Sequence, residues 1–231
     1  MEDPTRIPRV LDELRATWEG QPNLSLPTLF GILANRGVAW GTTDHELIDA
    51  LQAEAARHPA DLPRNSDGHV SGHYLVTTTN PEMRVTCTPG FVVVRAARQH
   101  NRRQPGVWPY SSIRPTGPGR LLVLADDEGI EHKLGVVSLI TALNDEAPRL
   151  DGLKREDRGN CQWLVITDDG RRHIISQVIT AWGAQRRHVD TTTQAWEHML
   201  SCEVGKPWMV RNQQGDTVHL GTIVHIVLLE A

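Results

Sequence analysis

The segment that most constrains the fold reads Leu122-Val123-Leu124-Ala125-Asp126-Asp127-Glu128-Gly129-Ile130-Glu131-His132-Lys133-Leu134. An apolar run meets an acidic turn that contains a glycine, and a second run then begins, which is the pattern of a β-hairpin. A close match follows at Leu164–Ile175, and a looser one at Val210–Leu220. In all three, a turn with glycine is followed by a histidine. Three hairpins of similar design predict that a β-rich body forms most of the chain.

The N-terminal part has a different pattern, because apolar residues recur at helical spacing over residues 5–58. Ser25 is the expected N-cap of a second helix within this part. Thr43, with Glu46 three residues later, predicts a capping box at the start of a third helix. We expect Trp18 to anchor the core of this three-helix module.

A further pattern covers about the first quarter of the chain and consists mostly of core and cap residues: Arg9, Val10, Leu11, Glu13, Leu14, Trp18, Pro22, Leu24 and Leu26, followed by Thr43, Asp44, Leu47, Ile48 and Leu51. At these positions the chain resembles the small bacterial YihD-like family, whose function is unknown. The resemblance implies a helical fold for this segment and assigns no active site to it.

Together these patterns predict an α+β protein. An N-terminal three-helix module, residues 1–62, is followed by a larger β-rich body of antiparallel hairpins, residues 70–231. Proline, glycine and asparagine between the two predict a linker. A second polar stretch, 144–160, marks a sub-boundary within the body. One or two short helices are also expected in the body, with Thr191–Leu200 and Val136–Leu143 as the segments that fit them.

The composition is that of an ordinary globular protein. The 231 residues are 39% apolar and 23% charged, with a net charge of −4. No apolar run approaches the roughly 20 residues that a membrane span needs, and the first residues do not form a signal peptide. We therefore expect a cytoplasmic protein with no membrane partner. The three cysteines lack a CxxC spacing, which favours reduced thiols over disulfides.

Charge is unevenly distributed along the chain. Residues 1–60 hold nine acids and five arginines, whereas Met83–Ala125 holds seven arginines and no acid. The arginines there are interleaved with aromatic residues, and such a combination stacks on bases or clamps phosphates. The candidate ligand-binding residues are Arg98, Arg102, Arg103, Trp108 and Tyr110. The alternative is that these arginines pair with acids of the helical module.

The remaining polar motifs give weaker signals. His132, His173 and His219 are weak zinc-ligand candidates that converge only if the hairpins pack side by side; otherwise each is a cross-strand neighbour. Two Asp-Asp pairs, Asp126-Asp127 and Asp168-Asp169, precede glycine and are typical of turns rather than of acid–base catalysis. The chain has no phosphate-loop, dinucleotide-binding or nucleophile-elbow motif, so no cofactor is expected.

These observations favour a binding or adaptor protein without catalytic activity, whose partner is another protein. The alternative is a nucleic-acid or phosphate-ligand binder that uses the arginine-rich loop, residues 95–110. A metal-dependent hydrolase built from the dispersed histidines and aspartates ranks third. The sequence indicates no particular partner, substrate or oligomeric state.

Overall fold

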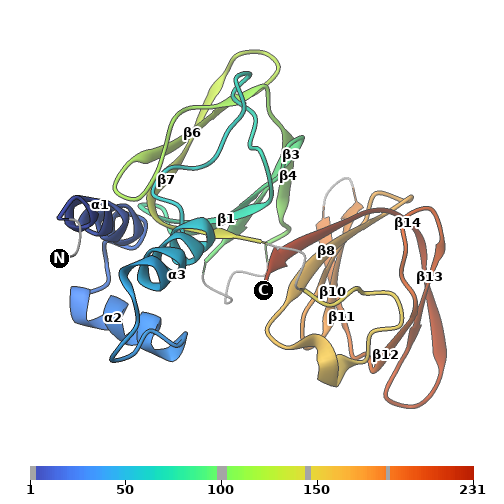
Figure 1. Ribbon diagram of the computed structural model, residues 1–231. Helices are drawn as coiled ribbons and strands as arrows, with labels where there is room; N and C mark the ends of the chain where they lie inside the picture. The colour runs from blue at the N-terminus through green and yellow to red at the C-terminus, as the bar shows by residue number, and fades with distance from the viewer. Residues whose placement is uncertain (1–3, 98–102, 144–146, 186–187) are drawn as a thin grey trace. The chain divides into compact units, whose positions relative to one another are not determined.

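The computed structural model describes residues 4–97, 103–143, 147–185 and 188–231 (Figure 1). Three N-terminal helices precede two curled antiparallel sheets, which confirms the α+β class, although most of the ordered structure is strand. The helices are α1 (Arg6–Glu19), α2 (Leu26–Asn35) and α3 (Asp44–Arg57). Among the described residues, no helix has the length and apolar character needed to cross a membrane.

Local capping fixes where the helices begin. Ser25 accepts a hydrogen bond at Oγ from the Thr28 amide at 3.3 Å, as predicted for the N-cap of α2. The capping box of α3 is also confirmed, because Thr43 Oγ1 accepts from the Glu46 amide and the Glu46 carboxylate accepts from the Thr43 amide. Both caps satisfy amides that a helix leaves without an internal partner.

Trp18 does not anchor the helical core, contrary to the prediction. Its side chain is 38% exposed, and Nε1 donates to the Leu24 carbonyl at 2.8 Å. The fully buried residues are instead Leu29, Leu33 and Leu51. Thr17 occupies the buried position next to Trp18 on α1, so the residue before the tryptophan faces the core.

The chain divides into two compact units, and the first contains the helices together with seven strands. The helices are thus part of a larger unit, because residues at the end of α3 bind the sheet. His58 Nδ1 lies 3.1 Å from the Ile140 carbonyl, Asp61 pairs with Arg120, and Leu62 enters the sheet core. The strands of this unit are β1 (Tyr74–Thr79), β2 (Met83–Cys87), β3 (Phe91–Ala96), β4 (Gly106–Pro109), β5 (Ser112–Ile113), β6 (Leu121–Ala125) and β7 (Glu131–Ala142).

The second unit contains the other seven strands and one short 3-10 helix, η1 (Arg155–Arg158). Its core is rich in large side chains, with Trp196 and Trp208 both fully buried. The strands are β8 (Gln162–Thr167), β9 (Arg172–Ile175), β10 (Ile179–Gln185), β11 (His188–Gln194), β12 (His198–Ser201), β13 (Pro207–Arg211) and β14 (Thr217–Glu230).

The two sheets have the same topology. The strand order is β4-β3-β2-β1-β7-β6-β5 in the first unit and β11-β10-β9-β8-β14-β13-β12 in the second. Every strand of the second sheet therefore takes the place of the strand seven positions earlier. All pairings are antiparallel, and in each sheet the first and last strands of the unit are hydrogen-bonded to each other (β1 to β7, β8 to β14).

Individual hydrogen bonds repeat along with the topology. The Gly119 amide donates to the Val137 carbonyl at 2.8 Å, and 86 residues later the Gly205 amide donates to the Ile223 carbonyl at 2.8 Å (119 to 205, 137 to 223). The same register of contacts in both units shows that one seven-stranded fold occurs twice in tandem.

The turn that defines the first hairpin has its counterpart in the third hairpin rather than in the second. Asp126 accepts hydrogen bonds from the amides two and four residues later, at 3.0 and 2.9 Å. Asn212 makes the same two contacts, both at 2.9 Å. Each turn then needs a glycine with positive φ, 77° at Gly129 and 88° at Gly215. The hairpin at Leu164–Ile175 is formed by β8 and β9 and corresponds to β1 and β2.

Both segments predicted to fit a short helix within the body are strands. Val136–Leu143 overlaps the end of β7, which lies between β1 and β6 and therefore carries an apolar run that resembles a buried helix. Thr191–Leu200 falls on β11 and β12. Its three consecutive threonines favour the extended conformation, and this preference outweighed their capacity to cap a helix.

Candidate functional site

The residues predicted in the arginine-rich loop are not all open to a ligand. Arg98 and Arg102 lie outside the described residues, whereas Arg103 is exposed. Trp108 is 39% exposed on β4, with its ring centroid 5.8 Å from that of His132. Tyr110, in contrast, is 3% exposed; its hydroxyl donates to the Thr88 carbonyl at 2.7 Å and accepts from the amide of Val70. Tyr110 is therefore a core residue whose ring is not available for stacking.

The three histidines proposed as weak metal ligands belong to two different units. His132 donates from Nε2 to Asp126 Oδ2 at 2.8 Å, and this hydrogen bond lowers the pKa of the Asp126 carboxyl. His173 is buried in the second unit, and His219 is on β14 in the same unit. Over residues 4–97, 103–143, 147–185 and 188–231, no group of three or more histidine, cysteine or acidic side chains could hold a metal ion.

His173 is an unusual core residue. It pairs with Val165 across β8 and β9, whereas the equivalent pair in the first unit is Val85 with Val76. Its Nε2 lies 3.3 Å from Thr167 Oγ1, while Nδ1 is buried without a hydrogen-bond partner. Burial lowers the pKa of His173 to about 4, so the ring is neutral at pH 7.

The cysteines are buried free thiols. Burial raises the pKa of Cys87 to about 12, and burial together with Asp151 raises that of Cys202 to about 12. Because the thiolate is the reactive form, neither side chain is an activated nucleophile at neutral pH.

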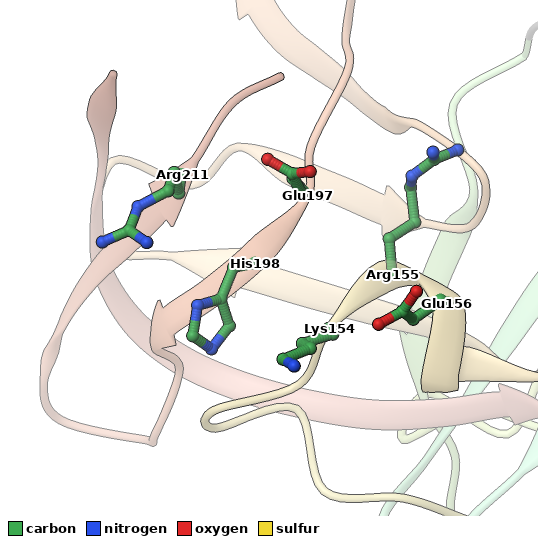
Figure 2. Close-up of a pocket in the computed structure, with 6 residues that line it drawn as sticks. All are labelled: Lys154, Arg155, Glu156, Glu197, His198 and Arg211. Atoms are coloured by element: carbon green, nitrogen blue, oxygen red, sulfur yellow. The ribbon is translucent and has the colours of Figure 1, made fainter. Parts of the chain in front are cut away.

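A polar pocket of about 290 Å³ lies entirely within the second unit (Figure 2). Three segments far apart in sequence meet there: the start of η1, the start of β12 and the end of β13. The pocket is lined by Lys154, Arg155, Glu156, Glu197, His198 and Arg211. Its volume is at the small end of the range for small-molecule sites, so it suits a compact ligand.

Backbone pairing fixes the positions of these side chains. Lys154 forms an isolated antiparallel bridge with His198, and His198 pairs in turn with Arg211 on β13. Residues directly opposite each other in antiparallel strands place their side chains on the same face of the sheet. Neighbouring strands lie about 5 Å apart, so the side chains of such a pair are close together. Lys154, His198 and Arg211 therefore form a row across three chain segments, called here the cationic row, and Figure 2 shows the His198 ring between the other two side chains.

Within the described residues, the cationic row forms no ion pair. In the described part of the chain, Lys154, Arg155 and Arg211 form no ion pair, although Glu156 and Glu197 line the same pocket. His198 Nε2 lies 3.2 Å from the Gly152 carbonyl, and since a carbonyl only accepts, Nε2 carries the proton. Nδ1 of the same ring has no hydrogen-bond partner in the described part of the chain.

The first unit provides an internal comparison for this pocket. The pair equivalent to His198 and Arg211 is Ser112 and Ala125. The residue that precedes the pair, Glu197 in the second unit, is Ser111 in the first, where its hydroxyl donates to the carbonyls of Ala125 and Asp126. The same backbone thus carries small neutral residues in one unit and charged residues in the other. At positions 197, 198 and 211 the polar and charged side chains are therefore not required by the fold.

A second exposed feature lies on the helical module. At about 100° per residue, Ile7, Leu11 and Trp18 fall within roughly 40° of one another around α1. These residues, called here the α1 stripe, are 53%, 54% and 38% exposed. Nearby in sequence, Phe30 is 45% exposed and Trp40 is fully exposed.

Comparison of the chain with protein-family models, with curated proteins and with solved structures finds no match.

Proposed function

We propose that the protein is a non-catalytic binding protein whose second unit holds the phosphate group of a small ligand. The supporting observation is the cationic row, in which Lys154, His198 and Arg211 are aligned by strand register and have no carboxylate partner among the described residues. Phosphate presents several acceptor oxygens, and charge-assisted hydrogen bonds to them are among the strongest polar contacts. The pocket volume favours a small phosphate ester over a nucleic-acid chain.

The energetics also support a binding role. Lys154 and Arg211 flank His198 in one row, where two like charges on the same face repel each other, and the first unit shows that serine and alanine fit at positions 198 and 211. A protein that keeps such charges trades stability for function. A bound anion would convert the repulsion into attraction.

Removing one member of the row should weaken phosphate binding. Arg211→Ala introduces the residue found at the equivalent position 125, and we expect affinity for inorganic phosphate to fall about ten- to a hundredfold, since hydrogen bonds to charged groups contribute about 1.5–3 kcal/mol. The free energy of unfolding should stay the same or rise slightly, because no ion pair is lost. Isothermal titration calorimetry and urea unfolding measure the two quantities.

The matched control is Lys133→Ala. This exposed residue of β7 lies in the first unit, so its loss removes one positive charge without touching the pocket. Phosphate affinity should be unchanged in this variant. If the wild type does not bind phosphate, or if Arg211→Ala binds it equally well, the proposal is wrong.

A protein partner is the second candidate function, and the α1 stripe favours it. Exposed apolar residues on one side of a helix are typical of a surface that pairs with another apolar helix. The stripe of a second copy of this chain is one such surface, because a two-fold dimer brings identical patches together. In this proposal the helical module forms the interface, and the second unit is left to bind its ligand.

Self-association tests this second candidate. The double variant Ile7→Gln with Leu11→Gln should sediment as a monomer at concentrations at which the wild type associates, with stability little changed because both residues are more than half exposed. Leu121→Gln is the control, since Leu121 is 48% exposed on β6 and lies outside the stripe. Identical sedimentation of all three proteins would exclude the stripe as a contact between copies.

A further inference from the structure

We propose that Arg158 makes the pocket of the second unit selective for a dianionic phosphate, so that the ligand is a phosphomonoester rather than a phosphodiester. This inference rests on the proposed phosphate site and concerns a residue just outside its lining. Arg158 is the last residue of η1, the short helix on which Figure 2 shows Arg155 and Glu156 at the pocket.

Arg158 is a buried basic residue without a counter-ion. It is 5% exposed; Nη1 donates to the Cys161 carbonyl, while Nε is buried without a hydrogen-bond partner. In the part of the chain that the structure describes, Arg158 forms no ion pair. A buried charge without a partner is costly, because burial removes the water that would solvate it.

The other buried ionisable side chains of the described residues, apart from the cysteines and Tyr110, do not carry an uncompensated charge. Glu54, buried in the first unit, is paired with Arg36, and the His173 ring is neutral at pH 7. Arg158 thus differs from both, and it belongs to the same short helix as two residues of the pocket. An anion held by the cationic row would supply the missing counter-charge.

The geometry of η1 brings Arg158 close to the pocket. A 3-10 helix has three residues per turn and rises about 2 Å per residue, so Arg155 and Arg158 lie on the same side of η1, about 6 Å apart along its axis. The field of a buried charge is screened less than that of a surface charge. It reaches the Cys161 thiol, whose pKa is raised by burial and lowered to a smaller extent by Arg158. We expect the same field to act on an anion in the pocket.

The first unit again provides the comparison. The Gly68 carbonyl accepts from the Ile113 amide at 2.9 Å, just as the Leu153 carbonyl accepts from the Met199 amide at 2.8 Å. Between this point and its first strand, the first unit has no lysine or arginine, whereas the second has three, all within residues 154–158. The buried cation and the pocket therefore occur together in the second unit, and neither basic residues nor a buried cation occupy this segment of the first.

Selectivity follows from the charge of the ligand. The electrostatic energy of an anion in a given field is proportional to its charge, so a dianion gains twice the free energy that a monoanion gains. A phosphomonoester has a second pKa of about 6 and is a dianion at pH 8, whereas a phosphodiester has only one ionisable proton and is a monoanion. The field of Arg158 therefore favours the monoester.

Methyl phosphate and dimethyl phosphate are matched probes, titrated by calorimetry into the full-length protein at pH 8. We expect the wild type to bind methyl phosphate about tenfold or more tightly than dimethyl phosphate. Arg158→Gln should weaken binding of methyl phosphate about tenfold and of dimethyl phosphate only about threefold. Arg158→Met should do the same, since both variants remove the charge and only glutamine keeps a donor for the Cys161 carbonyl.

The matched control is Arg149→Gln. It removes a positive charge that is exposed in the same unit and lies outside the pocket lining, so water screens it and both affinities should be unchanged.

The outcomes separate this inference from the proposed function. Equal affinity of the wild type for the two esters overturns the inference without any variant and leaves the phosphate site standing. An equal loss for both esters in either variant, or a loss in Arg158→Met alone, also overturns it, because Arg158 would then act through its hydrogen bond or its packing. If neither inorganic phosphate nor either ester binds the wild type, the inference and the proposed function are both wrong.

Discussion

His173→Val is expected to remove most of the acid sensitivity of the second unit. In the folded protein the pKa of His173 is lowered to about 4 by burial, against an ordinary value of about 6.5. Between these two pH values the unfolded chain takes up a proton that the folded chain does not. The free energy of unfolding of the wild type therefore falls as the pH is lowered through this window, by up to about 3 kcal/mol. Valine cannot be protonated, so the free energy of unfolding of the variant lacks this contribution to its pH dependence.

The charged neighbours of His173 do not titrate in the same window. Burial raises the pKa of Asp169, but hydrogen bonds from the Thr167 hydroxyl and the Arg171 amide outweigh it, so the net shift is downward from 3.8. Urea unfolding of both proteins at pH 7.5 and pH 4.5 gives the difference directly.

Valine should fit at this position, because Val85 occupies the equivalent place in the first unit. The control is His219→Val, which removes a histidine from an exposed position on β14 and should leave the pH dependence as it is in the wild type. If His173→Val loses stability between the two pH values as steeply as the wild type does, burial of the neutral ring is not the cause.

Trp208→Ala is expected to cause a large loss of stability in the second unit. The side chain is fully buried, packs edge-on against His173 with 5.0 Å between ring centroids, and donates from Nε1 to the sulfur of Met199 at 3.5 Å. Removing a buried indole leaves a cavity and typically costs about 3–5 kcal/mol. The midpoint of urea unfolding, followed by circular dichroism, measures this loss.

Two exposed tryptophans serve as controls. Trp40 is fully exposed and Trp18 is 38% exposed, so Trp40→Ala should change the free energy of unfolding by less than about 0.5 kcal/mol and Trp18→Ala by less than Trp208→Ala. A loss for Trp40→Ala as large as that for Trp208→Ala would contradict the assigned burial. A small loss of stability for Trp208→Ala would contradict the assignment of Trp208 to the core of the second unit.

The parts of the fold that depend on neighbours in sequence could be predicted from the sequence. Ser25 and Thr43 cap helices through contacts three residues away, and Asp126 closes its turn through contacts two and four residues away. Such contacts leave a local pattern of residue types, so the helices, their starts and the first hairpin were recognisable.

Features that depend on distant pairing were not predicted. The end of β7 looked like a helix because its neighbours, β1 and β6, come from elsewhere in the chain. The pocket was not predicted for the same reason, since Lys154, His198 and Arg211 come together only through strand register. One signal was present: the hairpin at Val210–Leu220 echoes the one at Leu122–Leu134. Aligning those two hairpins would have set Arg211 against Ala125 and His198 against Ser112.

The tandem arrangement of one topology also has a consequence during synthesis and refolding. Two units that follow each other in sequence and have equal strand order expose edges that can pair with the wrong unit before either has closed, and strand exchange of this kind is a common route to misfolding in repeat proteins. Divergence of the side chains guards against it. A β9 segment carrying His173 would bury its imidazole in the place of Val85 if it entered the first unit, and β13 would insert Trp208 where the first core holds Leu122. These differences in core side chains thus disfavour the pairing of a strand with the wrong sheet.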